Sequence, residues 1–174
     1  MIRRLVKIVI VILFILILRE VIMLIYLDRT NKYEIIKYYN KEYEFSHSEK
    51  MVIELPTIKL KQVVNKANAD FSNLNNSLVY YKNNNYEKKI IIFGHSGMGY
   101  GTYFNKLDRL NINDIAYLYI NNKKISYYVN DIFKVSKEEI DVLKNEKKSI
   151  LLLITCDKYD KNKRLIVKLG LKSV

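Results

Sequence analysis

The most apolar part of the chain lies near its N-terminus, where residues 8–27 read IVIVILFILILREVIMLIYL. Only Arg19 and Glu20 are charged in this segment, and on a helix such neighbours point about 100° apart and need not pair. Twenty helical residues rise about 30 Å, which matches the thickness of a bilayer core. The free energy gained by moving so many large apolar side chains from water into lipid outweighs the cost of inserting two charges. The pattern therefore predicts a transmembrane helix over residues 8–27.

This transmembrane helix is expected to be an uncleaved signal anchor. Residues 1–7 form a short basic start, but large and charged residues, including Arg19 and Glu20, stand where a cleaved signal peptide would have small ones. Long domains are translocated largely regardless of their flanking charges. We therefore expect a single-pass plasma-membrane protein with residues 1–7 in the cytoplasm and the folded domain outside.

Residues 28–50 form a polar, charge-balanced segment that separates the apolar helix from the rest of the chain. Its apolar residues recur at a loosely helical spacing. They are Ile35, Ile36, Tyr39 and Tyr43. We interpret this segment as a short stalk helix that lifts a domain of residues 51–174 off the membrane.

After Met51 the pattern changes from helical to extended. Short runs rich in Ile, Val, Tyr and Leu alternate with clusters of Asn, Lys, Gly or Asp, which is typical of strands and turns. Seven runs predict strands: 51–60, 77–81, 89–93, 115–120, 125–133, 150–154 and 165–169. So many short strands in this length indicate a mainly β domain, either a barrel or a sandwich.

A few segments of this domain predict helix or a tight turn instead. Helices are expected over residues 67–75 and 136–143, the second because Ser136 and Glu139 have the spacing of a capping box. Residues 103–109 could form a further helical turn. The pair Asn121 and Asn122 between two Tyr-rich runs predicts a hairpin.

Composition and charge exclude several functions. The chain has 174 residues, 49% of them hydrophobic, which is enough for one domain with a buried core and argues against disorder. The net charge is +12, but the lysines are scattered, without a basic helix or an RNA-binding aromatic signature. No nucleic-acid partner is expected, and the basic surface suits an anionic cell envelope.

The few cysteines and histidines narrow the chemistry further. One cysteine excludes an internal disulfide and any cysteine-cluster metal site. The two histidines, His47 and His95, are 48 residues apart without an acidic helper motif, so we expect neither a metal nor another cofactor.

Two strand ends carry the candidate chemistry. The apolar run before Gly94 leads into His95, and four of the five glycines of the chain lie between residues 94 and 101. The run ILLLI is apolar on both faces, which indicates a central strand, and it ends at Thr155 and Cys156. If residues 157–163 connect a hairpin, Arg164 lies across from Cys156 on the next strand.

Each of these residues also has a purely structural interpretation. A free cysteine is often a small buried hydrophobe, a histidine in a glycine-rich loop can be a turn residue, and an arginine at a strand start is usually solvated. Their joint placement favours a reactive thiol in Cys156. Other motifs fit less well: GHSGMGYG lacks the G-x-G-x-x-G order of a dinucleotide site, and no G-x-S-x-G nucleophile elbow is present.

Five separated motifs, in this order, resemble those of the sortase family over residues 51–171. They are Leu55-Pro56-x-Ile58-x-Leu60, Gly94-His95-Ser96-Gly97, Phe104-x-x-Leu107-Asp108-x-Leu110-x-x-x-Asp114, Leu153-Ile154-Thr155-Cys156, and Arg164-Leu165-Ile166-Val167. The chain departs from the family pattern at Leu152, where sortases usually have Thr.

The resemblance implies a closed eight-stranded sortase-type barrel and a thiol transpeptidase that acts on a sorting signal similar to Leu-Pro-x-Thr-Gly. Cys156 would be the nucleophile, His95 the general acid and then base, and Arg164 the donor to the oxyanion or substrate carbonyl. Thr155, Ser96 and Gly97 would contact the substrate. The partners would be surface proteins with a C-terminal sorting signal and an amine acceptor such as a peptidoglycan precursor.

The resemblance also favours a small class A-, D- or E-like sortase. Pilin-polymerising class C enzymes usually have an Asp-Pro-aromatic lid and a second membrane helix, whereas the only proline here is Pro56 and no apolar tail precedes Val174. Class B enzymes usually have a long insertion before the cysteine, and residues 134–149 are too short for one.

Two rival functions remain open at this level. One is a non-enzymatic anchored protein that uses the barrel and its basic surface to bind an anionic wall polymer. The other is a papain-like thiol peptidase, which is disfavoured because Cys156 follows His95 in the sequence and ends a strand rather than starting a helix.

Overall fold

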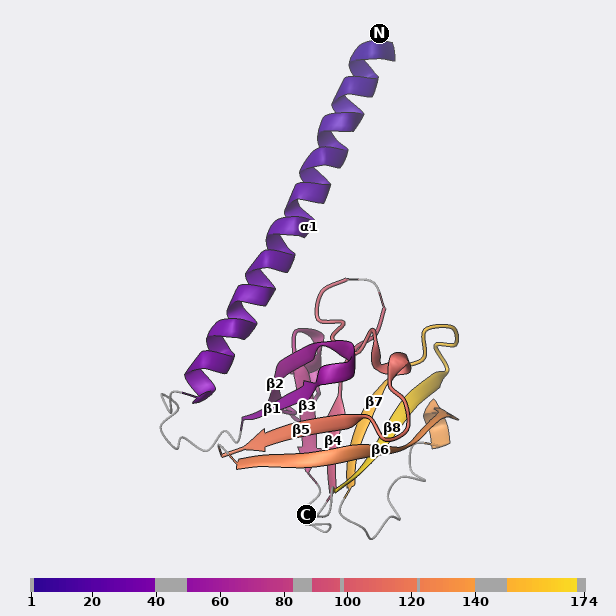
Figure 1. The fold of residues 1–174 in the computed structure, drawn as a ribbon. Coiled ribbons are helices and arrows are strands. Elements are labelled where there is room, and N and C mark those ends of the chain that lie inside the picture. Colours follow the sequence, from indigo (N-terminus) through magenta and orange to yellow (C-terminus); the bar gives the residue numbers. More distant parts are fainter. Residues whose placement is uncertain are drawn as a thin grey trace.

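The computed structural model shows a long N-terminal helix attached to a β-barrel (Figure 1). The structure describes residues 2–39, 50–82, 89–97, 99–121, 123–139 and 150–171. Residues 40–49 of the predicted stalk, which include His47, lie outside the described residues.

Helix α1 (Ile2–Tyr39) has 38 residues, so it is about 57 Å long. It is the one helix of the described residues that is long and apolar enough to cross a membrane, with an 18-residue window of mean hydropathy 3.1 that is entirely exposed. Such a helix suggests membrane anchoring. The side chains of Arg19 and Glu20 approach one another after all, with Nε of the arginine 3.9 Å from Oε1 of the glutamate.

The last third of α1 packs on the barrel at strand β2 (Leu60–Lys66). Because β2 pairs with its parallel neighbour only from Val64 onward, one edge of its first half has no strand partner. Asn31 covers this edge: its Nδ2 donates to the Lys61 carbonyl (3.2 Å), and its Oδ1 accepts from the Val63 N–H (3.4 Å). Tyr38 is buried against Val63 and seals the contact.

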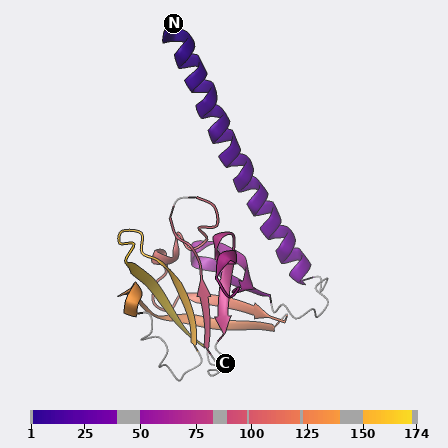
Figure 2. The same cartoon turned by 180° about the vertical axis from the view of Figure 1, so that it is seen from behind.

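The barrel contains eight strands and is closed, so the prediction of a closed, mainly β barrel behind an apolar helix is confirmed. The order around the barrel is β1-β2-β3-β4-β7-β8-β6-β5. Besides β2, the strands are β1 (Met51–Leu55), β3 (Leu78–Lys82), β4 (Lys89–Phe93), β5 (Ile115–Ile120), β6 (Lys123–Ser136), β7 (Ile150–Cys156) and β8 (Lys163–Leu171). Figure 2 shows β7 and β8 from behind, side by side in the wall of the barrel.

Strand β7 is buried on both faces, as its uninterrupted apolar sequence predicts. Leu151 and Leu153 point into the main core of the barrel. Ile150, Leu152 and Ile154 belong to a second apolar cluster on the other face, which also contains Phe93 and Phe133. Six of its seven residues are buried, so the strand is held firmly up to the position before Cys156.

The prediction of one strand over residues 51–60 is wrong, because the chain turns at Pro56. Pro56 starts a short 3₁₀ turn, Pro56–Ile58, and Lys59 then adopts a left-handed conformation (φ 54°) before β2 begins. Proline has no N–H to give to a strand partner, which ends the pairing of β1 at this point.

The helix predicted over residues 67–75 is also wrong, since only Ser72–Asn75 forms a 3₁₀ turn. Polar side chains bond the backbone here: Asn73 Nδ2 donates to the Lys66 carbonyl (2.7 Å), and the Ser72 N–H donates to Asp70 Oδ1 (3.0 Å). These local bonds compete with those of a helix.

The other predicted turns are partly present. Ser136 is the last residue of β6 rather than a helix cap, although its N–H does donate to Glu139 Oε2 (3.4 Å), and residues 137–139 form one 3₁₀ turn. Residues 140–143 of that expected helix lie outside the described part. Between 103 and 109 only Leu107–Arg109 is 3₁₀ helix. The hairpin at Asn121 is confirmed, with Ile120 paired to Lys123 and a left-handed Asn121 (φ 48°).

Truncation of a side chain in β7 should test this core. Leu151 is fully buried, so Leu151→Ala should lower the free energy of unfolding by about 2–5 kcal/mol through lost burial and a cavity. Ile112 is 52% exposed, and Ile112→Ala should change it by less than about 0.5 kcal/mol. Circular dichroism melts of the full chain in detergent measure both, and equal effects would contradict the assigned core.

Candidate active site

The parallel pairing of β4 with β7 brings two distant strand ends together. Phe93 pairs with Ile154, and the Gly94 N–H continues the ladder by donating to the Ile154 carbonyl (3.1 Å). β4 ends at Phe93 and His95 follows in the loop after it, at the edge of the barrel where β7 ends at Cys156. Both residues are partly exposed there.

The hairpin of β7 and β8 adds Arg164, which pairs directly with Cys156 as the sequence predicts. The next pair of the hairpin is joined by the Asp157 N–H and the Lys163 carbonyl (3.0 Å). Cys156 and Arg164 therefore form a pair without ladder hydrogen bonds, the type in which side chains of neighbouring strands come closest.

Arg164 does not point freely into solvent. Its Nη1 donates to the carbonyls of Lys161 (2.9 Å) and Lys163 (3.0 Å) in its own turn. These bonds fix the guanidinium beside the hairpin, and they use only one of its nitrogens.

Hydrogen bonds connect the loop after β4 to the end of β7 and to residues further along the same loop. Ser96 Oγ donates to the Cys156 carbonyl (2.5 Å), and the Phe104 N–H donates to the His95 carbonyl (3.0 Å). Gly97 has a φ of 135°, which only glycine adopts without strain, and its N–H and carbonyl both bond the Asn105 amide (2.5 and 2.7 Å).

Gly94 permits the close packing from which this loop starts. A Cβ at this position would lie 2.5 Å from Cδ2 of Leu78 and 2.6 Å from Cδ2 of Phe104, both buried. Any other residue would push the loop, and His95 with it, away from the barrel.

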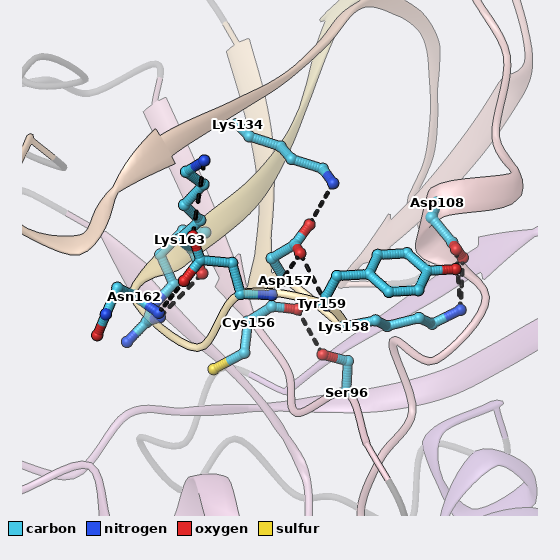
Figure 3. A network of polar contacts seen from close by, with 11 residues as sticks. Ser96, Asp108, Lys134, Cys156, Asp157, Lys158, Tyr159, Asn162 and Lys163 are labelled. Atoms are coloured by element: carbon cyan, nitrogen blue, oxygen red, sulfur yellow. Dashed lines mark hydrogen bonds and ion pairs between the residues drawn. The ribbon is translucent and has the colours of Figure 1, made fainter.

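Alternation along β7 separates two faces at the cysteine. Thr155 is 3% exposed, and its Oγ1 has no hydrogen-bond partner among the described residues. Figure 3 shows the sulfur of Cys156 pointing away from the ion pair of Lys134 and Asp157. The thiol and the residues that flank it in sequence therefore face different sides of the strand.

A small cleft with a volume of about 30 Å³, partly open to solvent, lies at this end of the barrel. Cys156, Thr155 and Ser96 line it, whereas His95, Arg164 and Gly97 do not. The other lining residues are Phe104, Asp108, Lys134, Asp157, Lys158, Tyr159 and Leu165.

The residue after the cysteine organises the β7–β8 turn. Asp157 is buried, and its Oδ1 accepts from the N–H groups of Tyr159 (2.8 Å) and Asp160 (2.9 Å). Lys134 Nζ lies 2.5 Å from its other oxygen. Hydrogen bonding to Lys134 is the main reason that the pKa of Asp157 lies below its usual 3.8, and the same bond raises the pKa of Lys134.

A second ion pair ties the turn to the segment before β5. Lys158 Nζ contacts both oxygens of Asp108 at 2.9 Å. Phe104 and Leu107, which precede Asp108 in the sequence, are buried in the core. Figure 3 shows the two ion pairs with Tyr159 between them.

Sequence reasoning missed the part that Lys134, Asp157 and Lys158 play in this cleft. Asp157 carries a readable signal, because aspartate at the start of a turn commonly accepts the next N–H groups of the backbone. No local signal marks Lys134, which arrives from β6 through the pairing of β6 with β8.

These features define a closed barrel with a partly exposed cysteine at the end of a central strand. The model of the sortase domain family matches residues 53–171, which is more than half of the chain. The chain belongs to the sortase family, whose members are cysteine transpeptidases. No curated protein matches the sequence.

Solved sortases share the fold. Sortase A from Corynebacterium diphtheriae superposes with a TM-score of 0.62 at 24% identity, covering 72% of this chain and 61% of that one. Sortase C-1 from Actinomyces oris gives 0.63 at 23% identity, covering 79% and 82%. Both A- and C-type enzymes are thus similar to this barrel, and the likeness does not separate the classes.

The ion pair at the cleft should be visible in the pH dependence of stability. Because the folded-state pKa of Asp157 lies below 3.8, its contribution is complete above about pH 4 and is lost as the pH falls through the folded pKa. Asp157→Asn keeps an oxygen for the turn but loses the charge. We expect it to cost about 1 kcal/mol at pH 7, or about 2–4 °C in Tm, and to flatten the fall in Tm below pH 4.

Asp160→Asn is the matched control. Asp160 lies in the same turn, but its side chain is 42% exposed and its ion pair with Lys163 is longer, at 3.6 Å. Its Tm should follow that of the wild type at every pH. An acid limb that is unchanged by Asp157→Asn would show that this carboxylate does not stabilise the turn.

Proposed function

We propose that this chain is a membrane-anchored transpeptidase that cleaves a sorting signal similar to Leu-Pro-x-Thr-Gly and transfers the carried protein to an amine of the cell envelope. One observation carries the proposal. The register of β4, β7 and β8 pairs Cys156 with Arg164 and brings the strand that leads into His95 to the same edge of the barrel. An imidazole, a thiol and a guanidinium at one edge of a barrel suit acyl transfer.

The proposed reaction has two acyl transfers. The Cys156 thiolate attacks the Thr carbonyl of the signal, and the C–N bond to the following glycine breaks as His95 protonates the departing amine. A thioester on Cys156 remains. An acceptor amine, deprotonated by His95, then attacks the thioester, forms an amide bond and releases the thiolate.

Arg164 would stabilise the negative charge that forms on the carbonyl oxygen. Its Nη1 is held by two turn carbonyls, and the N–H groups of Nε and Nη2 are the donors proposed for the substrate. A guanidinium stays charged at every physiological pH, so its contribution does not depend on a proton.

Ser96, Gly97 and Thr155 are proposed to contact the substrate. Thr155 offers a buried hydroxyl in the cleft next to the cysteine, and Ser96 links the loop to the carbonyl of Cys156. Gly97 has a positive φ that favours glycine, and the position of its missing Cβ has no neighbour within 4 Å, which supports a place for a peptide beside it.

The proposed organisation has a cytoplasmic tail (1–7), a membrane span (8–27), a stalk (28–50) and a catalytic domain outside the cell (51–174). The apolar α1 supports the span. Basic residues lie on both sides of it, so the orientation is proposed because long domains are translocated largely regardless of flanking charge. We retain a small class A-, D- or E-like enzyme as the proposed subclass, since Pro56 is the only proline and an Asp-Pro-aromatic lid is absent from the sequence.

Replacement of the cysteine tests the chemistry directly. The full chain in detergent, given a panel of peptides similar to Leu-Pro-x-Thr-Gly and an amine acceptor, should form the transpeptidation product, and mass spectrometry should detect the acyl-enzyme. Cys156→Ala should abolish both, because no other thiol exists in the chain. Product formation that continues unchanged in Cys156→Ala would exclude the proposed mechanism, and no product from either chain would favour a binding protein.

Arg164→Ala should lower kcat/KM by about 10²–10³, the usual effect of removing one donor to an oxyanion. Arg164→Lys should recover part of this loss, because it restores the charge without the planar set of donors. Lys163→Ala, which removes the neighbouring cation on the same strand, should stay within a few-fold of the wild type. Equal effects of Arg164→Ala and Lys163→Ala would assign Arg164 to the general surface charge.

A further inference from the structure

The cleft end of the barrel lies on the same side as the N-terminal part of α1. In Figures 1 and 2 the loop between β4 and β5 and the turn between β7 and β8 both extend toward the N-terminus of the helix. The start of β7 and the end of β8 lie at the opposite end. In both views the cleft end of the barrel therefore faces the N-terminal part of α1.

Contacts at two heights fix the barrel against α1. Asn31 and Tyr38 hold the C-terminal part of the helix to β2. Further toward the N-terminus, the Tyr100 hydroxyl donates to the Glu20 carboxylate. Since α1 is one continuous helix, the loop that carries His95 and Tyr100 is held at a set position along the apolar segment.

This position lies inside the end of the proposed membrane span. Glu20 lies seven residues before Leu27, the end of the apolar segment, which is about 10 Å along the helix. A carboxylate at that depth is costly in lipid unless it has a polar partner, and Tyr100 supplies one. Tyr26 of α1 is exposed and lies nearer to Leu27, at the level of the headgroups, where tyrosine is enriched.

The environment of Tyr100 agrees with this location. Desolvation beside the helix, followed by the hydrogen bond to Glu20, raises the pKa of its phenol above the usual 10.0. The hydroxyl therefore stays protonated and remains a donor to Glu20 at neutral pH.

The turn at the same end carries an excess of positive charge. Lys158, Lys161, Lys163 and Arg164 lie within seven residues, against Asp157 and Asp160. Lys161 is exposed and has no carboxylate within ion-pair distance among the described residues. Each lysine or arginine close to an anionic membrane strengthens its binding.

We propose that the cleft end of the barrel docks on the anionic phospholipid surface of its own membrane, with Tyr100 reaching below the headgroups beside α1 and the β7–β8 turn binding the headgroups. The inference rests on the membrane span of the proposed function and on neither its catalytic step nor its orientation. Docking places the strand end that carries Cys156 close to the bilayer surface, so a peptide or an amine that is itself attached to the membrane is held near the thiol.

Fluorescence quenching by spin-labelled lipids tests the proposal on the full chain. Cys156→Ala leaves no native thiol, so a single fluorophore can be attached after Tyr100→Cys, Lys161→Cys or Leu171→Cys. Leu171 ends β8 at the opposite end of the barrel and is 41% exposed. In vesicles of phosphatidylglycerol and phosphatidylcholine, headgroup nitroxides should quench the first two labels several-fold more than the third.

The charge is tested in the same vesicles. Lys161→Glu in the Tyr100→Cys chain should remove most of the gain in quenching that phosphatidylglycerol gives over phosphatidylcholine alone. Lys123→Glu is the matched control, since Lys123 is exposed at the end of β6 remote from Ser136, and it should change little.

Equal quenching at all three positions, stronger quenching at Leu171, or no dependence on phosphatidylglycerol would overturn the proposal. A melting curve shows whether each labelled variant is folded. If one of the two variants at the cleft end does not fold, the other still tests the proposal. Because every chain here lacks Cys156, the result stands apart from the transpeptidation assay, and either proposal can fail alone.

Discussion

The parallel pairing of β4 with β7 is the constraint on which the candidate site depends. These strands are separated by more than fifty residues, and only their register aligns the end of one with the end of the other. Apolar packing supports this pairing on both faces, with Leu151 and Leu153 in the main core and Leu152 and Ile154 in the second cluster. The pairing brings the loop that carries His95 to the end of β7, where the Ser96 hydroxyl bonds the Cys156 carbonyl.

Electrostatics complete what packing begins at the end of β7. Asp157, which follows the cysteine, has a buried carboxylate. Lys134 Nζ from β6 lies 2.5 Å from this carboxylate and neutralises its charge. The same carboxylate bonds two N–H groups of the following turn, so the turn that presents Arg164 is held from the inside. A buried carboxylate without this partner would destabilise the hairpin, and the pair is worth most as a constraint on geometry.

The long helix extends these constraints to the membrane. Its last third replaces a missing strand partner at the edge of β2 through Asn31, and this is a rigid connection because both groups of one amide are used. The barrel is consequently not a freely swivelling domain at the end of a tether in this structure. Its cleft end and the apolar segment lie on the same side of the barrel, so under the proposed function the anchor would help to place the candidate site.

The sequence by itself determined the elements whose signals are local. The apolar helix, the central strand predicted over 150–154, the hairpin at Asn121 and the pairing of Cys156 with Arg164 all follow from periodicity and short connections, and the structure extends that strand to Cys156. It misjudged residues 67–75, where side chains such as Asn73 bond the backbone and replace a helix, and residues 51–60, where Pro56 divides one strand into two. The roles of His95, Cys156 and Arg164 remain predictions from the motifs.

Only the tertiary structure decided which distant segments meet. The closure of the barrel, the approach of Lys134 to Asp157, the cleft beside Thr155 and the contact of Tyr100 with Glu20 join residues that are far apart in the chain. Such contacts leave no mark in local sequence, because they depend on which strands pair and on the register that buries the most apolar surface.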